Sequence, residues 1–208
     1  MNLHLNVITY VLIVDCLAII SPGPDFFMVL RNSLARSYKA GIYTTLGITL
    51  GGGIMFAAGL FGVAKIVSTN QWIFQAIKIL GGSYLIYLAL KAILSKVTIQ
   101  EPQLVYATEP KTNLFEYFRV GLICNLTNPK AFMFVISLSA YAATESANTL
   151  DNLLIVLGSC LFTAIWFCTV AIIFGQARVR KIFYSKQRIM NILFGCFLLY
   201  VASEIMFM

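Results

Sequence analysis

The chain has 208 residues, of which 60% are hydrophobic and 11% are charged, and its formal net charge at pH 7 is +7. A soluble globular domain averages about 45–50% apolar and about 25% charged residues, so this composition excludes an ordinary water-soluble domain. The basic residues stand at the ends of apolar blocks and form no basic groove with interleaved stacking residues, which argues against nucleic acid as a partner. The lipid bilayer is the expected partner of most of the chain.

Six apolar blocks follow one another along the chain. A helix needs about 20 residues to cross a hydrocarbon core of about 30 Å, and the blocks have lengths of this order. Lipid requires every backbone polar group to be satisfied internally, and the blocks lack the alternation of membrane β-strands. We therefore predict an all-α membrane protein with six transmembrane helices, over residues 5–30, 41–67, 72–94, 115–141, 153–175 and 189–206.

The longest polar stretch, residues 95–114, carries two prolines and charges of both signs, which is typical of a linker. It separates a first three-span half, residues 1–94, from a second half, residues 115–208. Because each half has an odd number of spans, the second half enters the membrane from the opposite side. The sequence therefore predicts two inverted three-helix repeats, an arrangement found in many secondary transporters.

The Lys and Arg residues predict the orientation of these spans. Most of them lie in the connections after the first, third and fifth blocks, whereas the connection before the fifth block carries Glu145 and Asp151. Positive charge collects on the cytoplasmic side of a membrane. Both termini are therefore expected on the non-cytoplasmic side, and the linker in the cytoplasm.

The first block is interrupted by the motif Ser21-Pro22-Gly23-Pro24-Asp25. The two prolines remove two backbone donors and crowd the preceding turn, while Gly23 permits a sharp change of direction. We predict that the helix kinks or unwinds here. The freed carbonyls then need a partner, or must line a wet cavity.

The fourth block is interrupted in the same way by Asn125-Leu126-Thr127-Asn128-Pro129-Lys130. Two broken helices in corresponding positions of two halves indicate a transporter's substrate site, since half-helix N-termini hold a carboxylate and unwound carbonyls hold a cation. A zwitterionic amino acid needs both. The predicted substrate-binding residues are Ser21, Pro22, Gly23, Pro24, Asp25, Asn125, Asn128, Pro129 and Lys130.

Three charged residues lie near these breaks. Asp15 precedes Pro22 by seven residues on roughly the same helix face, and a charge at a helix centre costs roughly 2.5–3.5 kcal/mol. Asp15 and Asp25 are therefore candidate proton carriers, and Lys130 is expected to pair with one of them when the site is empty. Each charge also has a structural explanation. Asp25 would cap the second half-helix, Lys130 would reach to the interface, and Asp15 would pair with a neighbouring span.

Small residues are concentrated in the second and third blocks. Close helix packing is the commoner use of such glycines, although Gly51 to Gly53 would also leave room for a ligand. A packing face of this kind suits a homodimer and an internal helix interface equally well. The glycines are Gly47, Gly51, Gly52, Gly53, Gly59, Gly62, Gly81 and Gly82.

No metal site, disulfide framework or cofactor is expected. The only histidine is His4, and the five cysteines are odd in number and lack C-x-x-C spacing.

In their order and spacing, these motifs resemble the LysE/RhtB family of bacterial amino-acid exporters. The matching features are the motif from Ser21 to Asp25, Asn32-Ser33-Leu34, the stretch from Gly41 to Gly47, Gly81-Gly82-Ser83-Tyr84-Leu85, and the motif from Asn125 to Ala131. Phe26-Phe27 after the first motif is most similar to the threonine/homoserine branch.

The resemblance implies a multi-pass transporter of the bacterial inner membrane that is not an enzyme. It would export small neutral amino acids, such as threonine or homoserine, by proton antiport. Two alternatives remain open, a passive channel and a structural membrane subunit. An intramembrane hydrolase is a weaker alternative, because it would need a nucleophile with a base, or a metal set.

Overall fold

The computed structural model describes residues 4–94, 113–145, 147–173 and 177–207, and these residues form eight helices. The predicted linker lies outside the described residues except for its last two positions. The helices are α1 (Leu5–Ile20), α2 (Pro24–Ala35), α3 (Tyr38–Thr69), α4 (Gln71–Leu94), α5 (Leu114–Leu126), α6 (Pro129–Thr144), α7 (Thr149–Ile173) and α8 (Ala177–Phe207).

The first and fourth predicted blocks each form two helices, as their proline motifs predict. The helix pair α1 and α2 is bent by 50° and the pair α5 and α6 by 57°. In both pairs the second helix begins with proline at its first position, where the missing N–H costs nothing. The two breaks predicted from the sequence are therefore confirmed.

The described helices are long and apolar enough for two to four membrane spans. Tyr38–Gly62 of α3 and Thr149–Ile173 of α7 each suffice alone, and each bent pair suffices if it counts as one span. Within α4 and α8 the apolar stretches are shorter, Gly82–Leu94 and Asn191–Ser203. The six membrane spans and the two inverted repeats thus stay predictions.

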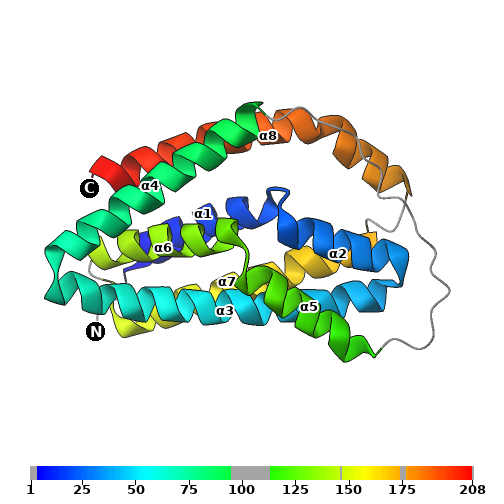
Figure 1. Ribbon diagram of the computed structural model, residues 1–208, viewed down its shortest axis with the longest axis horizontal. Coiled ribbons are helices and arrows are strands. Elements are labelled where there is room, and N and C mark those ends of the chain that lie inside the picture. Colours follow the sequence, from blue (N-terminus) through cyan, green and yellow to red (C-terminus); the bar gives the residue numbers. More distant parts are fainter. Residues whose placement is uncertain (1–3, 95–112, 146, 174–176, 208) are drawn as a thin grey trace.

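The helix α3 runs along the side of the molecule opposite to α4 and α8 (Figure 1). It packs against α2, α5, α6 and α7, whereas α4 and α8 run along each other at one side of the molecule. The start of α1 and the end of α8 lie at the same end of the molecule, on the left in Figure 1. The turn between α2 and α3 lies at the opposite end.

Glycines bring the backbones of α3 and α5 into contact. A Cβ atom at Gly47 would lie 2.0 Å from the Phe118 carbonyl oxygen, and one at Gly121 would lie 2.1 Å from that of Thr44. Such close approach is the usual role of small residues between membrane helices. The packing role predicted for Gly47 is confirmed. Because Gly47 packs against a helix of its own chain, this contact does not test the predicted homodimer, which stays a prediction.

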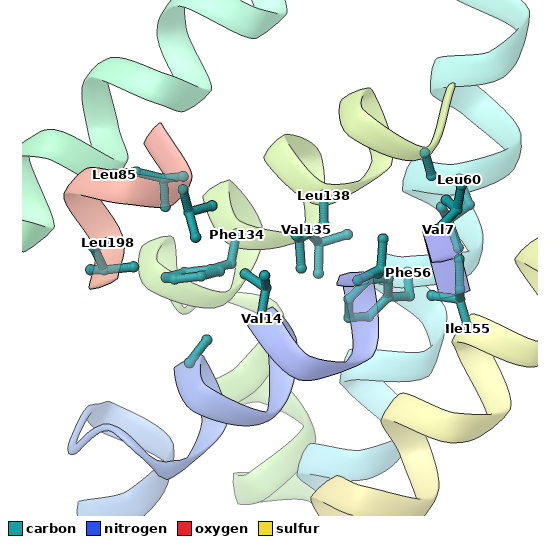
Figure 2. Packing of buried hydrophobic residues seen from close by; sticks show 14 of the residues in the cluster. Val7, Val14, Phe56, Leu60, Leu85, Phe134, Val135, Leu138, Ile155 and Leu198 are labelled. Carbon is teal, nitrogen blue, oxygen red and sulfur yellow. The ribbon is translucent and has the colours of Figure 1, made fainter. Parts of the chain in front are cut away.

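Two clusters of buried apolar residues lie on either side of the breaks. The larger gathers α1, α3, α4, α6, α7 and α8, and includes Val14, Phe56, Phe134 and Leu138 (Figure 2). The smaller joins α2 to α3 and α7 through residues such as Phe26 and Phe167. The level of the breaks is therefore the junction between the two clusters.

The outward faces of the long helices are also apolar. In α7, Leu153, Leu157, Leu161 and Ile165 follow one another at intervals of four residues, and each is about half exposed or more. A continuous apolar stripe of this kind marks an interaction surface, and lipid is the surface expected of an apolar spanning helix. The chain is a membrane-embedded helical protein.

A polar contact joins the start of α1 to the start of α7. The Nδ1 atom of His4 lies 2.7 Å from Oδ2 of Asp151, and the backbone N–H of His4 donates to Oδ1 of the same carboxylate. Asp151 is fully buried, and its Oδ2 also accepts from the Asn148 backbone. This contact aligns α1 with α7, whose side chains meet again deeper in the molecule.

Candidate functional site

A cavity with a volume of about 70 Å³ lies at the level of the two breaks. On a scale where about 10–15 Å³ holds one water molecule, it accommodates several waters or a small solute. Its lining comes from α1, α2, α3, α5, α6, α7 and the breaks between them, and the described residues of α4 and α8 contribute nothing to it. The cavity therefore lies where the two apolar clusters meet.

The carboxylate of Asp25 joins the two breaks. Both Asn125 and Asn128 donate from Nδ2 to Asp25 Oδ2, each at 2.9 Å. At the same time, Oδ1 of Asn128 accepts from the backbone N–H of Lys130 and caps α6. The Asn128 side chain thus caps the start of α6 and also contacts Asp25 of α2.

Lys130 reaches from α6 to the end of α1. Its Nζ donates to the carbonyl oxygens of Ala18 at 3.1 Å and Ser21 at 2.9 Å. In an unbroken helix, the N–H of residue 22 would bond to the Ala18 carbonyl, but Pro22 has none. The ammonium group replaces this donor and places a positive charge at a helix C-terminus, where it is favourable. The explanation that Lys130 reaches to the interface is therefore wrong.

The capping explanation for Asp25 is also wrong. Gly23 is the N-cap residue of α2, and the helix has no side-chain cap. Asp25 lies in the first turn of α2 and directs its carboxylate to α5 and the second break. Gly23 itself passes close to Lys130, because a Cβ atom there would lie 3.2 Å from the Lys130 Nζ.

Two buried oxygen atoms of this cluster lack a hydrogen-bond partner among the residues that the structure describes. They are Oδ1 of Asp25 and Oδ1 of Asn125, and both side chains line the cavity. The nearby thiol of Cys124 is at most a weak donor to Asp25. Leaving a buried acceptor unsatisfied costs about 1–3 kcal/mol. Both oxygen atoms can therefore accept hydrogen bonds from a solute that enters the cavity.

A second carboxylate, Asp15 of α1, lines the same cavity. Asp15 is buried, and its Oδ2 accepts a hydrogen bond of 2.6 Å from the Ser159 hydroxyl of α7. Thr163 lies one turn further along α7 and also lines the cavity. The structural explanation, that Asp15 pairs with a neighbouring span, is confirmed, although Asp15 faces the cavity as well.

The predicted site residues separate into two groups. Seven of them line the cavity, namely Asp15, Ser21, Gly23, Asp25, Asn125, Asn128 and Lys130. Pro22, Pro24 and Pro129 do not line it. Instead, they end α1 or begin α2 and α6. The prolines shape the breaks, and the polar residues beside them form the surface of the cavity.

Other parts of the lining were not predicted. Ser159 and Thr163 are four residues apart in an apolar block, which places them on one helix face, and this spacing would have pointed to a polar stripe. The apolar lining residues Met55, Phe56, Phe134, Val135 and Phe167 carry no comparable signal, because any apolar residue of a span could face a neighbouring helix.

Gly51 and Gly52 of α3 lie against this site. A Cβ atom at Gly51 would be 2.8 Å from Oδ1 of Asn125, whereas one at Gly52 would be 3.9 Å away, an ordinary contact. Gly52 also lines the cavity. The absence of a side chain at residue 51 therefore allows Asn125 to take its position beside Asp25.

Comparison with known proteins gives one family. Residues 16–208 match the family described as LysE type translocator. The uncharacterized membrane protein YahN of Escherichia coli (strain K12) is 31% identical over 176 residues, which cover 84% of this chain and 78% of YahN. The threonine efflux protein of the same strain is 31% identical over 176 residues, which cover 82% and 83%.

The leucine efflux protein of Salmonella choleraesuis (strain SC-B67) is 34% identical over 133 residues, which cover 64% of this chain and 61% of that protein. No solved structure matches the chain.

Proposed function

Because the chain belongs to the LysE family of translocators, and is therefore an amino-acid efflux transporter and not an enzyme, we propose that it exports small neutral amino acids by proton antiport. Threonine and homoserine are the proposed substrates. Relatives at 31% and 34% identity are named for threonine efflux and leucine efflux, which supports a neutral amino acid.

The meeting of the two breaks at one cavity carries this proposal. Asp25 and Lys130 bring charges of both signs to the cavity, as a zwitterionic solute requires. Most of the remaining surface is apolar, with Phe56, Phe134 and Phe167 among the lining residues. A small aliphatic or hydroxylated side chain suits this surface and the small volume better than a long cationic one.

We also propose that the chain crosses the membrane six times as two inverted halves. In both α1–α2 and α5–α6, a helix is followed by a short break and by a second helix that begins with proline. This repetition supports a repeated unit. The start of α1 and the end of α8 lie at the same end of the molecule, which an even number of crossings requires (Figure 1).

The orientation follows from the exposed basic residues. Arg31, Arg36 and Lys39 lie around the turn between α2 and α3, at the end opposite to the start of α1 and the end of α8. By the positive-inside rule this end faces the cytoplasm of a bacterium, and both termini lie outside.

Transport by the purified protein in liposomes tests the proposed function. Liposomes with an acidic lumen should accumulate labelled threonine or homoserine above the external concentration, because protons leaving the lumen drive the exchange. Labelled leucine and lysine complete the panel, and a protonophore and protein-free liposomes serve as controls. Equilibration without accumulation would indicate a passive channel, and no uptake of any amino acid would contradict an exporter.

A further inference from the structure

We propose that the two buried carboxylates of the cavity have separate roles, with Asp25 binding the substrate's ammonium group and Asp15 carrying the exchanged proton. This assignment rests on the proposed function. It comes from the hydrogen-bond partners of the two side chains, which differ in what they can donate and accept.

The partners of Asp25 suit its Oδ2 atom as an acceptor that carries no proton. Its Oδ2 accepts from the amide groups of Asn125 and Asn128, and an amide NH₂ can only donate. A proton on Oδ2 would therefore face two donors and no acceptor.

The other side of the Asp25 cluster is suited to a cation. Oδ1 of Asp25 and Oδ1 of Asn125 are both buried without a partner among the described residues, and both side chains line the cavity. A substrate ammonium group has three donors and no acceptor. It would satisfy both oxygen atoms at once, and its positive charge would also neutralise the Asp25 carboxylate, which a neutral amide or hydroxyl group would not do.

The partner of Asp15 is suited to a carboxyl group that gains and loses a proton. Its Oδ2 is bonded to the Ser159 hydroxyl, which can donate to a carboxylate or, after rotation, accept from a carboxylic acid. This contact can therefore persist in both protonation states. The titratable side chains around Asp15, among the described residues, are Cys16 on α1, Cys160 on α7, and Asp25 and Lys130 across the cavity.

Sharing one cavity couples the two carboxylates. Two ionised carboxylates that line one small cavity repel each other, and either a proton on Asp15 or an ammonium group at Asp25 removes this repulsion. Once one cation is bound, the second gains less from binding. The cavity would thus favour a proton or a substrate over both together, which is the requirement for antiport.

Two transport measurements on the same liposomes separate these roles. Exchange of labelled for unlabelled substrate needs the ammonium site and no net proton movement, whereas accumulation driven by a pH gradient needs both sites. Asp25→Asn should weaken substrate binding about 10- to 100-fold, and so reduce exchange and accumulation by the same factor at limiting substrate. Asp15→Asn should lose accumulation and retain exchange at saturating substrate, with a rate that no longer depends on internal pH.

The wild-type protein serves as the reference in these liposomes. If it neither exchanges nor accumulates any amino acid, the proposed function itself fails. If it does both, gradient-driven accumulation by Asp15→Asn would overturn the assignment of the proton, and full exchange by Asp25→Asn at limiting substrate would overturn that of the ammonium group.

A second variant keeps the assignment testable if Asp15→Asn does not fold. Ser159→Ala removes the hydroxyl partner of Asp15 and leaves the carboxyl group in place. It should shift the pH dependence of accumulation while exchange persists. An unchanged pH dependence in Ser159→Ala would contradict Asp15 as the proton carrier.

Discussion

Asn128 uses both ends of its side-chain amide. The oxygen caps the first turn of α6, and the nitrogen donates to Asp25 of α2, 103 residues earlier in the chain. Asn125, three residues before it, donates to the same carboxylate oxygen. These bonds join the two breaks directly. Asn125 can make its bond to Asp25 only because Gly51 leaves room for the Asn125 amide.

Gly51→Ala tests this dependence. The added Cβ atom would lie 2.8 Å from Asn125 Oδ1, so the amide must move, and its bond to Asp25 weakens. We expect the substrate concentration for half-maximal exchange to rise roughly tenfold, the effect of losing about 1.4 kcal/mol of binding. Gly62→Ala on the same helix is the matched control, because its Cβ atom would meet nothing within 4 Å. Equal half-saturation in the two variants would contradict the role of Gly51.

At the scale of helices, the first break depends on a residue from the other half of the chain. Pro22 removes the donor for the Ala18 carbonyl, and Lys130 supplies one from 112 residues away. The sequence predicts that freed carbonyls need a partner, since this follows from the proline alone. Which residue becomes the partner depends on how α6 packs against α1.

Lys130→Met should therefore destabilise the protein as well as the site. Methionine has a similar length but no donor, so it leaves the carbonyls of Ala18 and Ser21 without the bonds from Lys130, at about 1–3 kcal/mol for each buried group. We expect a melting temperature in detergent several degrees below that of the wild type. Lys39→Met, at an exposed lysine near the start of α3, should melt as the wild type does. The idea fails if the two variants have equal melting temperatures.

At the scale of the whole molecule, charge and topology favour one orientation. The exposed basic residues around the turn between α2 and α3 lie at the end of the molecule opposite to the start of α1 and the end of α8 (Figure 1). Glu145, the C-cap residue of α6, is exposed, and α6 ends at the end of the molecule where α1 starts. The charges predict the direction of insertion, and the structure adds which residues mark each end.

Single cysteines at the two ends test this orientation in intact cells. In a background with the five native cysteines replaced by alanine, Glu145→Cys should react with a membrane-impermeant maleimide added outside. Lys39→Cys should react only after the cells are permeabilised, because the positive-inside rule places it in the cytoplasm. The reverse pattern of labelling would show that both termini face the cytoplasm.

The sequence by itself determined the membrane class, the helical character and the two breaks, because composition, proline and glycine act on the chain within a turn or two. Only the tertiary structure decided which polar groups meet. Asp25 bonds to Asn125 across 100 residues, Lys130 to the end of α1 across 112, and Ser159 to Asp15 across 144. These partners are set by helix packing, where Gly47 and Gly121 bring backbones into contact, and no local preference of the chain specifies that packing.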